Sequence, residues 1–176
     1  MNNTKPKLAE VALSALFVAI ICVLAQIIIP TPWGVPFTLQ IFAVCLCGYL
    51  LGVKIAVTSV GAYILLGIIG IPVFSGFKGG IHALFGITGG FIFGFLAVAF
   101  FCGVARNTTK KYLKFIFSAV GIAVCHILGV LQLSLVSKSG FFASFVTASL
   151  PFILKDVILI FAAYFVAKIL EKRIKF

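Results

Sequence analysis

Charged residues are scarce in this sequence, and acidic ones are the scarcest: Asp and Glu occur three times among 176 residues, and Lys and Arg fourteen times. A charged fraction of 10% with a mean hydropathy of +1.31 lies far from the averages of soluble domains and excludes that class. Segments of alternating polarity, which mark an outer-membrane barrel, are also lacking, since the apolar runs are long and unbroken. We therefore predict an all-α integral membrane protein.

Patterns that bind nucleotides or metals are lacking too. No loop of the form GxxxxGK[ST] occurs, so any ATP-driven work must be done by a separate subunit. The five cysteines lie in apolar runs, and we interpret them as small hydrophobic residues. Cys45 and Cys47 would point to nearly opposite sides of a helix, and no second pair follows. We expect no metal and no cofactor.

Six apolar segments are predicted to be the transmembrane helices of a single membrane domain, residues 1–176. They are Leu8–Ile29, Leu39–Val53, Ile55–Ile69, Gly90–Ala105, Phe115–Val136 and Phe145–Leu170. The first is 22 residues long, enough to cross a hydrocarbon core of about 30 Å and too long for a cleaved signal peptide. The second and third are shorter and meet near Lys54, which suits helices packed beside a cavity. The fourth could begin as early as His82, and Pro151 falls in the first turns of the last.

The distribution of Lys and Arg predicts the orientation, because cytoplasmic loops carry an excess of both. With six helices and a cytoplasmic N-terminus, both termini are cytoplasmic and eleven of these residues lie inside: Lys5, Lys7, Lys54, Arg106, Lys110, Lys111, Lys114, Lys168, Lys172, Arg173 and Lys175. Lys78 and Lys138 lie outside, and Lys155 lies within the last helix. The proline loop Pro30–Pro36 then lies at the outer face. Because the positive charges are dispersed among membrane segments, nucleic acid is not an expected partner.

The segment Ile71–Phe91 separates the third and fourth predicted helices at the outer side. Nine of the 17 glycines lie between Gly67 and Gly94. Glycine permits positive φ angles and close approach to the main chain. At membrane depth, irregular backbone is tolerated only where protein or a polar cavity covers it. We interpret the region as an irregular outer segment that faces an interior site, and a surface turn before a glycine-containing helix is the alternative.

Asp156 is the acidic residue that lies in the interior of a predicted membrane helix, whereas Glu10 and Glu171 lie near cytoplasmic ends. A charge in that position costs roughly 2.5 to 3.5 kcal/mol on the insertion scale, and we expect a ligand or partner to offset it. Lys155 could extend to the outer interface, since adjacent helical residues do not face each other. The alternative is structural, with Asp156 paired to Lys78 or capping a broken helix.

Other polar and aromatic residues fall at the same depth. They are Thr38, Gln40, Ser75, Thr88, Gln132 and Ser134, together with Phe37, Phe74, Phe77 and Phe91. A few polar groups in an apolar, aromatic lining are typical of a small-molecule pocket. A different class of function would use Ser75 as the nucleophile of an intramembrane serine hydrolase, with His82 or His126 as its base. No third orienting group is evident in the sequence.

The first predicted helix carries a stripe of small residues, Ala12, Ala15 and Ala19, at spacings of three and four. Small side chains let another helix approach closely in a membrane. The stripe therefore predicts a contact with a partner helix, or else internal packing.

Five motifs together resemble the BioY family, the biotin-specific substrate-capture (S) components of energy-coupling factor (ECF) transporters. They are VPFTLQ at 35–40, GYLLG at 48–52, GIPVFSGFKGG at 70–80, GITGGFIFGF at 86–95 and LPFILKD at 150–156. The resemblance implies a six-helix S component of the cell membrane, not an enzyme, which captures biotin at its outer face. A membrane-embedded T component and two ATPases would drive release, with Ala15 and Ala19 at the T-component contact. An S component for another vitamin is the nearest alternative.

The resemblance also implies a binding set in which Asp156 accepts hydrogen bonds from the ureido N–H groups of biotin. The expected substrate-binding residues are Asp156, Lys155, Gln40, Thr38, Phe74, Ser75, Gly76, Lys78, Thr88, Gly89 and Gln132. Two positions depart from the family pattern: Ile87 replaces a proline, and Leu159 replaces a lysine that many members carry. The biotin carboxylate therefore needs another cation, and Lys155 and Lys78 are the candidates.

Overall fold

The computed structural model describes residues 8–32 and 34–173, so Lys5, Lys7 and Lys175 of the charge distribution lie outside the described residues. The elements in chain order are α1 (Leu8–Ala25), β1 (Ile28–Ile29), β2 (Phe37–Thr38), α2 (Gln40–Ile68), α3 (Ile81–Phe85), α4 (Gly89–Arg106), α5 (Lys111–Ser137), α6 (Phe141–Ala148) and α7 (Leu150–Arg173). Five of the helices, α1, α2, α4, α5 and α7, are long and apolar enough to cross a membrane. The expectation of an all-α membrane protein is confirmed, apart from the two-residue strands.

Helix α2 is a hairpin of two helical arms that meet at Gly52. This residue has φ 79° and ψ −179°, a conformation that glycine adopts without steric cost. Gln40 Nε2 donates to Tyr63 Oη at 2.7 Å, whereas 23 residues of straight helix would separate the two residues by about 35 Å. The arms therefore run antiparallel, and the predicted division into Leu39–Val53 and Ile55–Ile69 is confirmed.

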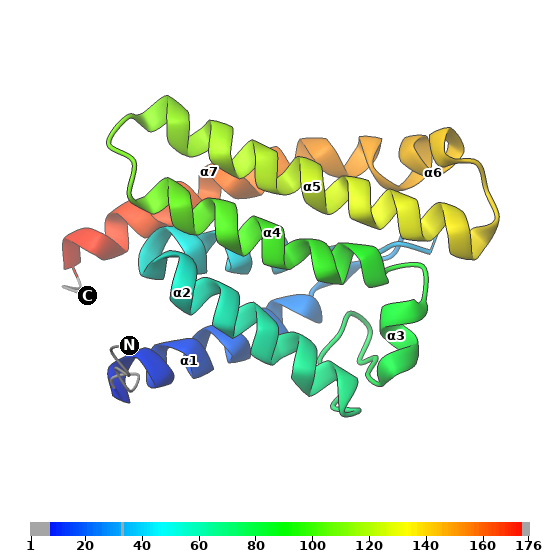
Figure 1. Cartoon of the computed structure of the whole chain (residues 1–176), viewed down its shortest axis with the longest axis horizontal. Coiled ribbons are helices and arrows are strands. Elements are labelled where there is room, and N and C mark those ends of the chain that lie inside the picture. Colours follow the sequence, from blue (N-terminus) through cyan, green and yellow to red (C-terminus); the bar gives the residue numbers. More distant parts are fainter. Residues whose placement is uncertain (1–7, 33, 174–176) are drawn as a thin grey trace, which may run out of the picture.

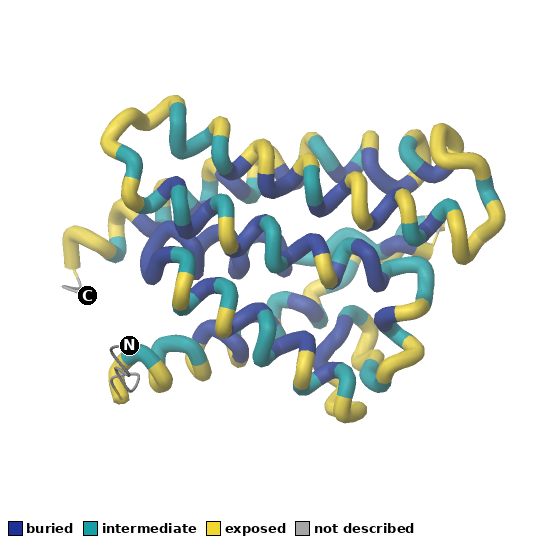
Figure 2. The backbone as a smooth tube through the Cα atoms, in the orientation of Figure 1, coloured by how far each residue is buried: buried dark blue, intermediate teal, exposed yellow. Residues whose placement is uncertain are grey.

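Helices α2 and α4 form the centre of the molecule, with α5 on the other side of α4 (Figure 1). Glycines allow the close approach: a Cβ on Gly103 would lie 2.5 Å from Val53 Cα, and one on Gly94 would lie 2.6 Å from Cys125 Cα. Buried residues follow α2 and α4, whereas α1 and α7 are largely exposed (Figure 2). In a membrane, lipid or a partner must cover these two outer helices.

Three of the predicted helix boundaries were wrong. The fifth helix begins at Lys111 rather than Phe115, one turn earlier. The first helix ends at Ala25 rather than Ile29, because Ile28–Ile29 pairs antiparallel with Phe37–Thr38 and closes the proline loop. The last predicted helix is broken at Ser149 into α6 and α7. Pro151 has no N–H to continue the ladder, so α7 starts afresh with Phe152 N donating to Ser149 O at 2.9 Å.

Helix α1 begins and α7 ends at the same end of the molecule (Figure 1). The opposite end gathers the end of α1, both ends of α2, and the starts of α4 and α7, together with the β1–β2 pair and α3. Helix α3 is separate from α4, so α4 does not begin near His82. This opposite end of the molecule contains polar residues that the sequence predicts to lie at one depth in the membrane, among them Thr38, Gln40, Ser75 and Thr88.

Candidate functional site

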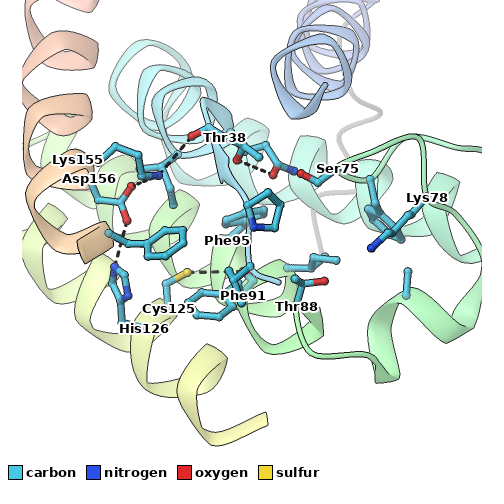
Figure 3. A pocket seen from close by; sticks show the side chains of 18 of the residues that line it. Thr38, Ser75, Lys78, Thr88, Phe91, Phe95, Cys125, His126, Lys155 and Asp156 are labelled. Atoms are coloured by element: carbon cyan, nitrogen blue, oxygen red, sulfur yellow. Dashed lines mark hydrogen bonds and ion pairs between the residues drawn. The ribbon is translucent and has the colours of Figure 1, made fainter. Parts of the chain in front are cut away.

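A cavity lies among these loops and helix ends (Figure 3). Its wall is largely aromatic, with Tyr63 from the second arm of α2, Phe91 and Phe95 from α4, and Phe152 from α7. The polar lining residues are Thr38, Gln40, Ser75, Lys78, Thr88, His126, Lys155 and Asp156. An apolar wall with a few polar groups from several elements is the composition of a small-molecule site.

Asp156 is the centre of a buried polar cluster on one side of the cavity (Figure 3). Its side chain is almost fully buried, and its Oδ2 lies 3.1 Å from His126 Nε2 on α5. His126 Nδ1 in turn lies 3.0 Å from Ser149 Oγ, at the break between α6 and α7. The break thus supplies a polar group that orients the histidine ring toward the carboxylate.

Lys155 and Asp156 form an ion pair although they are neighbours on α7. Lys155 Nζ lies 2.6 Å from Asp156 Oδ1, at angles outside those of a hydrogen bond, and it donates to Thr38 O at 3.3 Å. The rings of Phe37 and Phe152 flank the ammonium at 5.9 and 5.6 Å. The expectation that Lys155 does not face Asp156 is wrong, because the flexible lysine stem bends back across the helix. Asp156 pairs with Lys155 and His126 rather than with Lys78.

A second hydrogen-bonded chain fixes the wall formed by α2. Thr38 Oγ1 donates to Gln40 Oε1 at 2.9 Å, Gln40 Nε2 donates to Tyr63 Oη at 2.7 Å, and Tyr63 Oη donates to Val73 O at 3.3 Å. These contacts join both arms of the α2 hairpin to the segment that follows it. Gln40 and Tyr63 therefore hold fixed positions at the cavity surface.

The loop Phe74–Lys78 forms the wall on the far side from Asp156 (Figure 3). Its ends are joined by two hydrogen bonds, Phe74 N to Lys78 O at 2.9 Å and Lys78 N to Phe74 O at 3.2 Å. Ser75 Oγ donates to the carbonyl of Ala25 at 3.3 Å. Within residues 8–32 and 34–173, Lys78 has no ion-pair partner, so its ammonium is an uncompensated positive charge at the cavity.

The two sides of the cavity differ in charge. Lys155 and Asp156 compensate each other on the buried side, where Asp156 Oδ1 has no hydrogen-bond partner within the described part of the chain. A carboxylate oxygen in an ion pair still has acceptor capacity, so a ligand that donates an N–H to Asp156 Oδ1 is favoured. The opposite side presents the Lys78 ammonium. The arrangement suits a small molecule with N–H donors at one end and a negative charge at the other.

The sequence matches the profile of the BioY family over residues 1–176. The chain belongs to the BioY family. It is 39% identical to the "Probable biotin transporter BioY" of Pyrococcus horikoshii, over 94% of this chain and 98% of that protein. It is 38% identical to the "Biotin transporter BioY" of Thermotoga maritima, over 90% and 94%. Its fold matches a crystal structure of the S-component for biotin from an ECF-type ABC transporter, with a TM-score of 0.85 and 28% identity over 98% of this chain and 95% of that one.

Most of the residues that the sequence assigns to substrate binding in this BioY chain meet at the cavity. Those that line it are Thr38, Gln40, Phe74, Ser75, Lys78, Thr88, Lys155 and Asp156. Gly76, Gly89 and Gln132 lie outside the lining. Gln132 Nε2 donates to the carbonyls of Leu84 and Gly86, at 2.5 and 2.7 Å, and so holds the segment before α4.

The contacts of Ser75 contradict the pairing expected of a serine hydrolase. Ser75 Oγ is bonded to a backbone carbonyl, and the serine that contacts His126 is Ser149. Ser149 is fully buried at the break between α6 and α7.

Sequence reasoning missed several lining residues, above all His126, which it considered only as a catalytic base. Tyr63, Phe95, Cys125 and Phe152 were also missed. The sequence did contain a signal for His126: a histidine inside an otherwise apolar helix requires a polar partner. The two departures from the family pattern are both apolar: Leu159 packs against the main core, and Ile87 packs in a small cluster with Val35.

The alanine stripe of α1 is not internal packing. Ala12, Ala15 and Ala19 are all exposed, and the buried face of α1 is formed by other residues, among them Phe17 and Ile21. The stripe is therefore open to another helix.

We predict that His126→Leu destabilises the protein by about 1–3 kcal/mol, because Asp156 Oδ2 and Ser149 Oγ each lose a buried partner. The measurement is thermal unfolding of the purified protein in detergent. His82→Leu is the matched control, since His82 is exposed on α3 and should change stability little. Equal unfolding temperatures for wild type and His126→Leu would contradict the buried network.

Proposed function

We propose that this chain captures biotin at the outer face of the cell membrane as the S component of an ECF-type ABC transporter. The observation that carries the proposal is the buried Asp156 carboxylate beside the cavity of a BioY-family chain, with one oxygen that is ion-paired to Lys155 but has no hydrogen bond within the described residues. The biotin transporters among its relatives and the S-component fold support the same function. Transport, rather than catalysis, is the activity of a chain with these relatives.

Recognition of biotin follows from the charges of the cavity. Asp156 Oδ1 accepts an N–H of the ureido ring, which gives this buried oxygen its hydrogen bond. His126 and Lys155 hold the Asp156 carboxylate in place. The aromatic wall covers the apolar thiolane ring and side chain of biotin, and the biotin carboxylate extends toward Lys78 at the open side.

The proposed binding residues fall into two groups by their contacts. The residues that touch biotin are the cavity-lining ones, Thr38, Gln40, Phe74, Ser75, Lys78, Thr88, Lys155 and Asp156, with His126 added. Gly76, Gly89 and Gln132 act on the backbone: Gly76 allows the turn of the loop with φ 74°, a side chain on Gly89 would collide with the carbonyl of Leu84, and Gln132 holds the segment before Gly89.

The proposal includes six membrane crossings, with the single domain 1–176 placed so that both termini are cytoplasmic. Counting each arm of α2 as a crossing gives six with α1, α4, α5 and α7. The distribution of Lys and Arg supports this orientation. Lys54, at the turn of the α2 hairpin, pairs with Glu10 near the start of α1 at 2.8 Å, so this cation lies at the proposed cytoplasmic end.

A T component and two ATPases complete the proposed transporter, because the chain has no nucleotide-binding loop of its own. The exposed stripe Ala12, Ala15 and Ala19 on α1 is the proposed contact for a helix of the T component, since small residues allow close packing in lipid.

We predict that Asp156→Asn weakens biotin binding by about 1–3 kcal/mol, because a neutral amide is a poorer acceptor and leaves Lys155 unpaired. The measurement is equilibrium binding of labelled biotin to the purified chain. Glu171→Gln, an exposed change at the far end of α7, is the matched control.

Competition in the same assay distinguishes the alternative. Unlabelled biotin should displace the label, and thiamine and riboflavin should not. Displacement by another vitamin at lower concentration would assign the chain to that vitamin, and unchanged affinity in Asp156→Asn would remove this residue from the site.

We predict that Lys78→Gln weakens binding of biotin by about 2- to 5-fold and leaves binding of uncharged biotinamide unchanged, because only biotin carries the carboxylate that the exposed ammonium attracts. Lys138→Gln serves as the control for general surface charge. The same comparison in Lys155→Gln tests the other cation. Selective loss of biotin over biotinamide in Lys155→Gln, but not in Lys78→Gln, would put the carboxylate at the buried side.

We predict that Ala15→Leu and Ala19→Leu leave biotin binding unchanged and reduce biotin uptake in cells that contain the T component and ATPases. Larger side chains on this stripe would keep a partner helix at a distance. Ala143→Leu is the control, an exposed alanine on α6. Lost biotin binding in the purified α1 variants would show instead that the stripe supports the fold.

A further inference from the structure

Gln26, one residue beyond the end of α1, joins this helix to the loop on the open side of the cavity. Its Nε2 donates to Val73 O and Phe74 O, both at 3.2 Å, and its Oε1 accepts the N–H of Phe77 at 2.9 Å. Nε2 also lies 3.3 Å from Cys22 O in the last turn of α1. One half-buried amide therefore connects the end of α1 to three residues 47 to 51 positions away.

The loop Phe74–Lys78 has a conformation that needs such support. Gly76 and Phe77 have φ angles of 74° and 54°, and Phe77 is a bulky residue in the left-handed region. A non-glycine residue keeps this conformation only where its surroundings hold it. Phe77 is 72% exposed, so packing of its side chain contributes little, and Gln26 fixes its amide instead.

The position of this loop determines one wall of the ligand site. Phe74, Ser75 and Lys78 line the cavity, and the Phe74 ring packs edge-on against Tyr63 with 5.4 Å between ring centroids. Ser75 Oγ adds one more bond to the end of α1, at Ala25 O. Gln26 itself does not line the cavity, so it acts through the loop.

We propose that Gln26 is a positioning residue for the ligand site: it clamps the loop Phe74–Lys78 to the end of α1 and so holds this wall of the cavity in place against the ligand. The identity of the ligand as biotin rests on the function proposed above. The role of Gln26 in holding the loop rests only on its hydrogen bonds. Movement of the end of α1 is transmitted by this amide to Phe74, Ser75 and Lys78.

The test uses the full chain in detergent and the variant Gln26→Met, which keeps the length of the side chain and removes its donors and acceptor. Hydrogen–deuterium exchange is measured for residues 71–80, and the dissociation rate of labelled biotin is measured in parallel. We expect both exchange of this segment and dissociation to be about tenfold faster, since tenfold corresponds to the loss of a typical hydrogen bond.

Two control variants separate the clamp from general loosening. Gln132→Met removes the other glutamine that binds backbone carbonyls, and it should accelerate exchange near Leu84 and Gly86 but not in residues 71–80. Ser14→Ala changes a polar residue of α1 that contacts Thr58 instead of the loop, and it should alter neither exchange nor dissociation. If Gln26→Met does not fold, Gln26→Glu replaces it, because a carboxylate beside the Val73 and Phe74 carbonyls should also release the loop.

Exchange at the wild-type rate in a folded Gln26 variant overturns the proposal. So does faster exchange with unchanged biotin dissociation, because the loop would then not hold the ligand, and faster dissociation with unchanged exchange, because Gln26 would then act in another way. If the wild-type chain binds no biotin, the proposed function fails by itself. Faster exchange of residues 71–80 in Gln26→Met then still supports the clamp, and unchanged exchange overturns it.

Discussion

A carboxylate buried in a membrane protein needs charge compensation and hydrogen bonds, and the cavity is built around this requirement of Asp156. Lys155 compensates its charge from the same helix, and His126 reaches it from α5. Ser149 orients the histidine, which is possible because the chain breaks between α6 and α7 at this residue. Three features bring partners to the Asp156 carboxylate. They are the break at Ser149, the placement of α7 beside α5, and the bend of the Lys155 side chain toward it.

The helices were largely predictable from the sequence, because long apolar runs have few alternatives in lipid. The break of α2 was predictable as well, since Gly52 and Lys54 both argue against one continuous span. The break at Ser149 was missed although Pro151 marks it. Proline is compatible with the first turn of a helix as well as with a break, so the local sequence leaves both open.

Many residues that line the cavity were predictable from the sequence, whereas their contacts with one another were not. The predicted helix boundaries place Thr38, Gln40, Ser75, Thr88 and Asp156 at the same depth in the membrane. In the structure all five line the cavity. Which side a residue faces depends on packing between distant segments, and the local pattern of apolar and polar residues does not reveal that packing. Gln132 therefore turned out to bind backbone carbonyls, and the contacts of His126 and Gln26 were missed.

The cavity is shared between two parts of the molecule that have few direct bonds to each other. The acceptor side belongs to α5 and α7, and the cationic side belongs to the loop that Gln26 ties to α1. A ligand that contacts both sides acts as a cross-link between them and stiffens the whole bundle. Under the proposed clamp, a displacement of α1 away from α7 would separate the two sides of the cavity without any contact with the ligand.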